Sequence, residues 1–82
     1  MIDHEAYRTD DGKTHIVSTS GFTAGNEMVL SCSYEDYCEG MKKYREGKLI
    51  QVAFPMLNVD EREFLISGLN ADQFDEALGS QY

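Results

Sequence analysis

The chain has 82 residues and a formal net charge of −8, with 41% hydrophobic and 27% charged residues. That length suits one small domain over residues 1–82, because a chain of this size buries only about 60–65% of its unfolded surface. The composition excludes a disordered tail, no apolar run reaches the roughly 18 residues of a membrane span, and the negative charge disfavours direct nucleic-acid binding.

The first part of the chain, residues 1–32, is predicted to be β-rich. The Asp11-Gly12 dipeptide marks a turn, because Asp-Gly supplies the positive φ of a tight hairpin. Residues 14–19 are rich in β-branched side chains and predict a strand that pairs with residues 7–9 across this turn. Residues 27–32 alternate loosely and predict another strand. We therefore expect an antiparallel hairpin or a three-stranded meander.

The hydrophobic period changes at Ser33, where the predicted helical part begins and runs over residues 33–79. Apolar residues recur there at the spacing of an amphipathic helix. These residues are Tyr34, Tyr37, Cys38, Met41 and Tyr44. Ser33 is the expected N-cap, with Asp36 three residues later, and Gly47 is expected to end the helix in a left-handed conformation. Cys38 is expected to be a small core residue.

Residues 49–54, which precede Pro55, remain open between two structures. Periodicity cannot distinguish a short buried strand from a turn of helix that the proline ends. Gln51 interrupts the apolar run, so we expect it to find buried backbone partners.

Two further short helices are predicted, each opened by an asparagine. Asn58 with Glu61, and Asn70 with Gln73, have the spacing of reciprocal capping pairs. The expected inward residues are Phe64, Leu65 and Ile66 in the first helix, ending at Gly68, and Ala71, Phe74, Ala77 and Leu78 in the second, ending at Gly79. The expected fold class is therefore α+β, with the N-terminal hairpin or meander packed against three short C-terminal helices.

The histidines and cysteines do not predict a catalytic or metal site. Cys32 and Cys38 are five residues apart and His4 and His15 are scattered, which does not match the paired ligands of zinc sites. No serine lies in a Gly-x-Ser-x-Gly elbow. We therefore predict no enzyme, no cofactor and no metal. The N-terminus lacks the features of a signal peptide, so the expected location is the cytoplasm, where both thiols stay reduced.

Acidic residues gather towards the C-terminus, whereas residues 41–48 carry an excess of basic ones. We take six acids as candidate partner-binding residues: Asp60, Glu61, Glu63, Asp72, Asp75 and Glu76. The two helices that meet at Leu69 have the outline of a helix-turn-helix, but the second offers carboxylates where a recognition helix needs donors. Exposed carboxylates can instead imitate phosphates towards a nucleic-acid-binding protein. The alternative is that the charge serves solubility alone.

One run of residues carries a resemblance. It consists of Tyr44-x-x-Gly47-x-Leu49-Ile50-Gln51-x-Ala53-Phe54-Pro55-x-Leu57, followed by Glu61-Arg62-Glu63-Phe64-Leu65-Ile66-Ser67-Gly68. This pattern resembles small proteins of tailed bacteriophages and prophages, which join a variable β-rich N-terminal part to a helical block. The resemblance covers residues 33–78 and implies a phage origin and a host-cytoplasmic setting, but no particular activity. The chain departs from the pattern at Phe74, where a tryptophan is expected.

These observations predict a protein-binding accessory protein. In its sharpest form the chain is an inhibitor of a host protein, either nucleic-acid-binding or defensive, that acts by acidic-surface mimicry of DNA. The alternative is a virion or assembly component, or a homodimeric structural protein that uses exposed aromatic residues. The expected partner is a host or phage protein, with no membrane involved and a homodimer left open.

Overall fold

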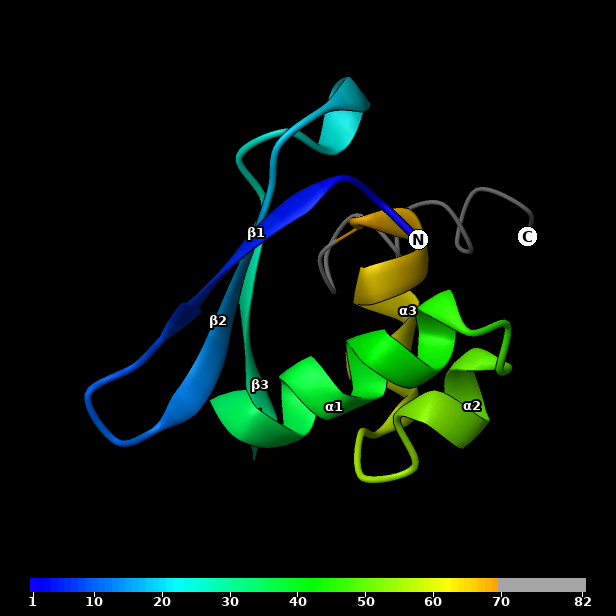
Figure 1. Cartoon of the computed structure of the whole chain (residues 1–82). Coiled ribbons are helices and arrows are strands. Elements are labelled where there is room, and N and C mark those ends of the chain that lie inside the picture. Colours follow the sequence, from blue (N-terminus) through cyan, green and yellow to red (C-terminus); the bar gives the residue numbers. More distant parts are fainter. Residues whose placement is uncertain (70–82) are drawn as a thin grey trace.

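A computed structural model describes residues 1–69 of the chain. The elements are β1 (His4–Arg8), β2 (Lys13–Ser18), a 3-10 turn (Gly21–Thr23), β3 (Glu27–Ser33), α1 (Tyr34–Arg45), α2 (Ile50–Ala53) and α3 (Val59–Ser67). A three-stranded sheet precedes the helices, which confirms the predicted α+β class (Figure 1). The predicted helix that begins at Asn70 lies outside the described residues.

The three strands form an antiparallel meander in the order β1-β2-β3. Ala6 pairs with Ile16, and Ile16 pairs with Met28. Gly12 has φ 86° in the turn between β1 and β2, as the Asp-Gly signal predicts. β1 begins at His4, earlier than predicted, because this segment owes its extended conformation to pairing with β2 rather than to its own β propensity.

The core lies between one face of the sheet and the helices. Ile16 and Leu30 of the sheet are fully buried, as are Phe54, Phe64 and Leu65 from the helical part. Among residues 1–69, no helix covers the other face of the sheet, which exposes Tyr7 and Val29, among others. The strands therefore alternate between a buried and a solvated face, as expected of an antiparallel sheet covered on one side.

Helix α1 starts and ends as predicted, and most of its predicted apolar face packs on the core, with Tyr34, Met41 and Tyr44 half-buried against it. The Asp36 N–H donates to Ser33 Oγ at 3.1 Å, and Gly47, with φ 100°, follows the last turn. Tyr37 and Gly40 are the buried residues of α1, whereas Cys38 is exposed. The prediction that Cys38 is a core residue is wrong because the buried face is set by Phe54, which packs where Gly40 has no side chain.

Residues 50–53 form the helix α2, which resolves the open alternative in favour of a helical turn. Ala53 is buried at the end of α2, and Phe54 follows it into the core. Gln51 is exposed, contrary to the expectation of buried partners. The helical period places Gln51 away from the side that Ala53 buries, whereas a strand would have put both on one face.

Helix α3 begins with the predicted capping box. The Glu61 N–H donates to Asn58 Oδ1 at 2.8 Å, and the Asn58 N–H donates to Glu61 Oε1 at 3.0 Å. Gly68 ends the helix with φ 75°. Phe64 and Leu65 are buried as predicted, but Ile66 is 47% exposed, because one further residue turns a helix by about 100° away from the core. No helix within the described part is long and apolar enough to cross a bilayer.

Candidate functional site

Of the six candidate acids, two are accessible, one is buried and three lie outside the described residues. Asp60 is exposed on the first turn of α3, Glu63 is half-buried one turn later, and Glu61 is buried between them. Asp72, Asp75 and Glu76 lie outside the described residues. Within α3, therefore, two candidate acids are accessible to a partner.

Glu61 joins α3 to the sheet instead of facing solvent. The Ser31 N–H donates to Glu61 Oε2 at 2.5 Å, and Ser31 Oγ donates to Oε1 at 3.0 Å. Oε1 also accepts the Asn58 N–H of the capping box. The expectation that Glu61 lies on a solvated acidic face is corrected by this burial, since a carboxylate with three donors satisfies groups that are costly to leave unpaired. Its spacing from Asn58 was a sequence signal for the capping bond, whereas no signal in the sequence indicated the bonds to Ser31.

A surface that the sequence did not indicate lies on α2 and α3. We call Leu49, Ile50, Val59 and Ile66 the α2–α3 surface. Leu49 is 66% exposed and Val59 is 70% exposed, and Ile50 and Ile66 line two adjacent hollows. The larger hollow measures about 500 Å³ and includes Leu49; the smaller measures about 250 Å³ and includes Val59. Ile66 was predicted to face the core, and only the packing of the elements shows that Leu49, Val59 and Ile66 are exposed while Ile50 is half-buried.

Charged side chains of both signs border the α2–α3 surface. Lys48 lines the larger hollow, and Arg62 and Glu63 line the smaller one. Asp60 is adjacent to Val59 in the first turn of α3. An apolar centre with a charged rim is the usual composition of a protein–protein contact surface.

Opposite charges are also separated along α1. Its first turn carries Glu35 and Asp36, and its last turn carries basic residues. These basic residues are Lys42, Lys43 and Arg45. At the acidic end, Arg8 of β1 bonds Glu35 at 2.6 Å and stacks 5.4 Å from the centre of the Tyr34 ring. This order matches the helix dipole and gives α1 one acidic and one basic end.

The pair formed by His4 and Tyr37 fastens the first strand to α1. His4 Nδ1 lies 2.8 Å from the Ile2 carbonyl, which can only accept, so Nδ1 carries the proton. In the neutral ring Nε2 then accepts from the Tyr37 hydroxyl at 2.6 Å. Burial raises the pKa of Tyr37 to about 12, which keeps this hydroxyl protonated as a donor. Both ring nitrogens of His4 are used, and no group of three metal-ligating side chains occurs in residues 1–69.

No family model, curated protein or solved structure matches this chain.

Proposed function

We propose that the chain is a small acidic accessory protein that acts by binding another protein, and that the partner is a basic protein of a bacterial host. The observation that carries the proposal is the α2–α3 surface. Leu49 and Val59 expose most of their apolar side chains there, next to two hollows. Contiguous exposed apolar patches on small domains mark interaction sites.

Charge must contribute to this binding as well. Burying one large aliphatic side chain is worth about 1.5–3 kcal/mol, whereas association costs about 4–15 kcal/mol. Three or four such side chains contribute about 4.5–12 kcal/mol, which is similar to that cost and leaves little net affinity. A net charge of −8 attracts a basic partner over a distance and raises the rate of encounter.

The acids that support mimicry of nucleic acid are those that remain accessible. Asp60 adjoins Val59, and Glu63 lines the smaller hollow, so both lie at the rim of the α2–α3 surface. Glu61 is not proposed as a partner-binding residue, because its carboxylate is buried. Asp72, Asp75 and Glu76 follow α3 in the sequence and stay candidates on their charge alone.

The phage resemblance supports a host target, because a phage protein that acts by binding meets host proteins in the infected cell. A nucleic-acid-binding or defence protein fits the acidic charge best. The alternative, a virion component or a homodimer, would use the same apolar surface against other copies or other phage proteins.

Comparative purification from a bacterial lysate tests the proposal. The tagged wild-type chain, a Leu49→Ser/Val59→Ser variant and a Phe22→Ser/Val29→Ser control are compared by quantitative mass spectrometry at low salt. The control removes apolar side chains that are 83% and 54% exposed elsewhere on the molecule. We expect wild type and control to recover the same basic partner. The α2–α3 variant should recover at least about tenfold less of that partner.

Three results would contradict the proposal. The first is that no protein is enriched at low salt, and the second is that the α2–α3 variant retains the partner in full. The third is recovery of the chain in purified phage particles, which would favour the structural alternative. Raised salt should release the partner, since exposed charges are screened.

A further inference from the structure

We propose that the outer edge of β1 is a second docking site, which takes an extended segment of a partner protein as a fourth strand of the sheet. We call the backbone N–H and C=O groups of His4, Ala6 and Arg8 the β1 edge. The segment that fits alternates apolar and basic side chains. This site goes beyond the proposed function and is separate from the α2–α3 surface.

The register of the sheet determines which backbone groups are free. The Thr9 N–H donates to the Lys13 carbonyl at 3.0 Å, and the Thr19 N–H donates to the Asp3 carbonyl at 3.0 Å. Antiparallel partners exchange hydrogen bonds at alternate residues, so Glu5 and Tyr7 are the β1 residues that bond β2. The β1 edge therefore points away from β2, and within the described residues its groups make no hydrogen bond.

The opposite edge of the sheet is formed by β3, and it is covered. On β3 the Ser31 N–H is bonded to the Glu61 carboxylate, and α3 packs against this strand. Proteins usually protect edges by a covering element, a proline or a bulge. The described structure covers the β3 edge in this way, whereas β1 contains neither a proline nor a bulge. An uncovered row of donors and acceptors is the feature that recognises an extended strand.

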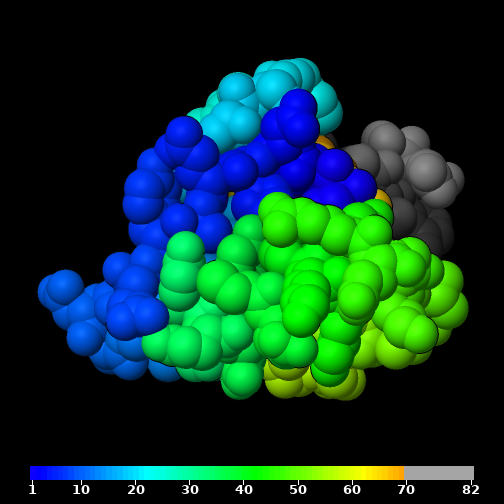
Figure 2. Space-filling view, viewed as in Figure 1, coloured from blue at the N-terminus to red at the C-terminus, as the bar shows by residue number. Residues whose placement is uncertain are grey.

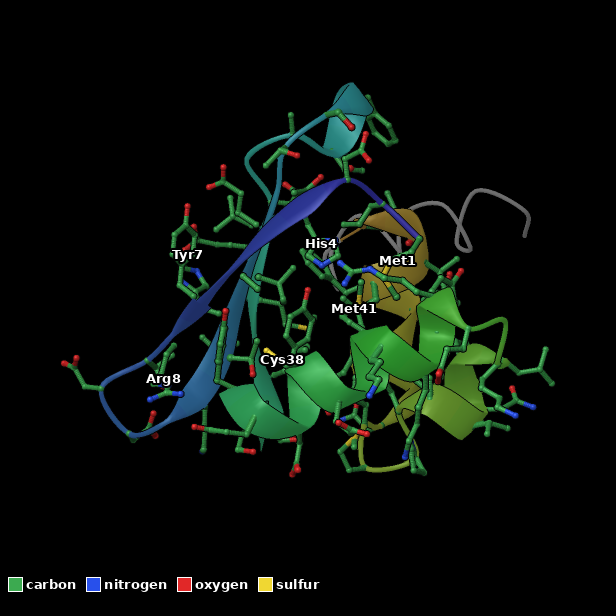
Figure 3. All side chains as sticks on the ribbon, viewed as in Figure 1. Met1, His4, Tyr7, Arg8, Cys38 and Met41 are labelled. Carbon is green, nitrogen blue, oxygen red and sulfur yellow. The ribbon has the colours of Figure 1, made fainter. Side chains whose placement is uncertain are left out.

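Helix α1 lies beside β1 and defines what the inward side chains of an added strand would meet. Figure 2 shows β1, in blue, and α1, in green, next to each other on one face of the molecule. In Figure 3 the side chains of His4, Cys38 and Met41 lie between these two elements. Cys38 is exposed and Met41 is half-buried, so small and apolar side chains fit on this side.

On its opposite side the added strand would face Glu5, whose carboxylate also accepts from the Tyr7 hydroxyl. Glu5 is exposed on the uncovered face of the sheet, in one row with Val17 and Glu27. Basic side chains on the outward positions would complement Glu5. A second copy of β1 is a poorer occupant, because it would bring its own Asp3 and Glu5 to an acidic strand whose Arg8 is already engaged by Glu35.

Amide hydrogen exchange of the full chain, measured by NMR, tests the inference. The probe is a capped synthetic peptide of alternating valine and lysine, and the control peptide has glutamate in place of lysine. In the free protein the Glu5 and Tyr7 amides should exchange slowly, and the His4, Ala6 and Arg8 amides rapidly. The lysine peptide at about ten times its Kd should slow these three amides about tenfold.

An Ala6→Pro variant removes the central donor of the β1 edge without removing a bond to β2, and proline is tolerated at such edge positions. It should abolish protection by the peptide, whereas Ala6→Ser should retain it. If Ala6→Pro does not fold, the exchange pattern of the wild type decides alone.

Three outcomes would overturn the inference. In one, neither peptide protects the edge amides, and in another both protect them equally. In the third, the amides become protected without peptide as protein concentration rises, which would identify a second copy as the occupant. None of these outcomes bears on the α2–α3 surface, because Leu49 and Val59 take no part in the measurement.

Discussion

At the scale of single residues, the Glu61 carboxylate joins helix α3 to strand β3. Glu61 is 6% exposed and accepts from two groups of Ser31 and from the Asn58 N–H. The capping role was visible in the sequence, because Asn58 and Glu61 have the required spacing. The bonds to Ser31 could not be predicted, because Ser31 lies 30 residues away on β3 and only the folded chain brings the two together.

Replacing Glu61 by glutamine should therefore lower the free energy of unfolding by about 1–3 kcal/mol, because an amide cannot accept all three hydrogen bonds. The control is Glu63→Gln, whose side chain is half-buried and which should change stability by less than about 0.5 kcal/mol. Urea denaturation measures both. Equal effects of the two substitutions would show that the Glu61 carboxylate does not join α3 to β3.

The raised pKa of Tyr37 predicts that the folded protein loses stability at alkaline pH. Its pKa is raised from 10.0 to about 12 by burial, so between these values the unfolded chain loses a proton that the folded chain keeps. Stability should be retained below pH 10 and should fall as the pH rises towards 12, by up to about 2–3 kcal/mol from this group.

The Tyr37→Phe variant should show a smaller fall over the same range, although it loses the hydrogen bond to His4. Tyr44→Phe is the control, because it also removes a half-buried tyrosine of α1 but keeps Tyr37 and its hydrogen bond to His4. Urea denaturation across the alkaline range measures the slopes. Parallel slopes for wild type and Tyr37→Phe would contradict the role given to burial.

At the scale of elements, periodicity predicted where the helices lie and most of each buried face, but not where each face ends. The caps at Ser33 and Asn58 placed the starts of α1 and α3 correctly, because capping is chemistry between near neighbours in the chain. The faces depend on neighbours distant in sequence. Cys38 and Ile66 each sit one residue past a buried position, and the sequence does not show where the core ends.

The contact between α1 and Phe54 gives a prediction at this scale. A Cβ at Gly40 would overlap ring atoms of Phe54, which is fully buried. Gly40→Ala should therefore destabilise the fold by about 1–3 kcal/mol, although alanine is the better helix former by about 1 kcal/mol. Glu39→Ala, at the exposed neighbouring position, should change stability by less than about 0.5 kcal/mol. Thermal unfolding of both variants checks this, and a stabilised Gly40→Ala would contradict the packing.

At the scale of the whole molecule, the sequence predicted the fold class and the meander but not the candidate binding surface. Turn chemistry, strand pattern and caps are local and agree with one another, so the α+β class follows from them. The α2–α3 surface, in contrast, depends on how elements pack and not on local sequence signals. Leu49, Val59 and Ile66 are apolar residues in or next to helices, and their exposure is decided only when α2 packs against α1 and α3 packs against β3.

The free chain should be a monomer at micromolar concentration, because copies that each carry a charge of −8 repel one another at low salt. Sedimentation equilibrium measures this directly. A stable dimer that Leu49→Ser/Val59→Ser converts to a monomer would contradict the expectation and favour the homodimeric alternative.

The central claim is that this scaffold presents the α2–α3 surface to a protein partner. The most direct test is hydrogen exchange followed by mass spectrometry, on the chain alone and in complex with the protein that it enriches from the lysate. We predict that peptides spanning residues 49–66 become protected in the complex, whereas the turn around residue 22 does not change. Protection confined to other parts of the chain, with residues 49–66 unchanged, would contradict the claim.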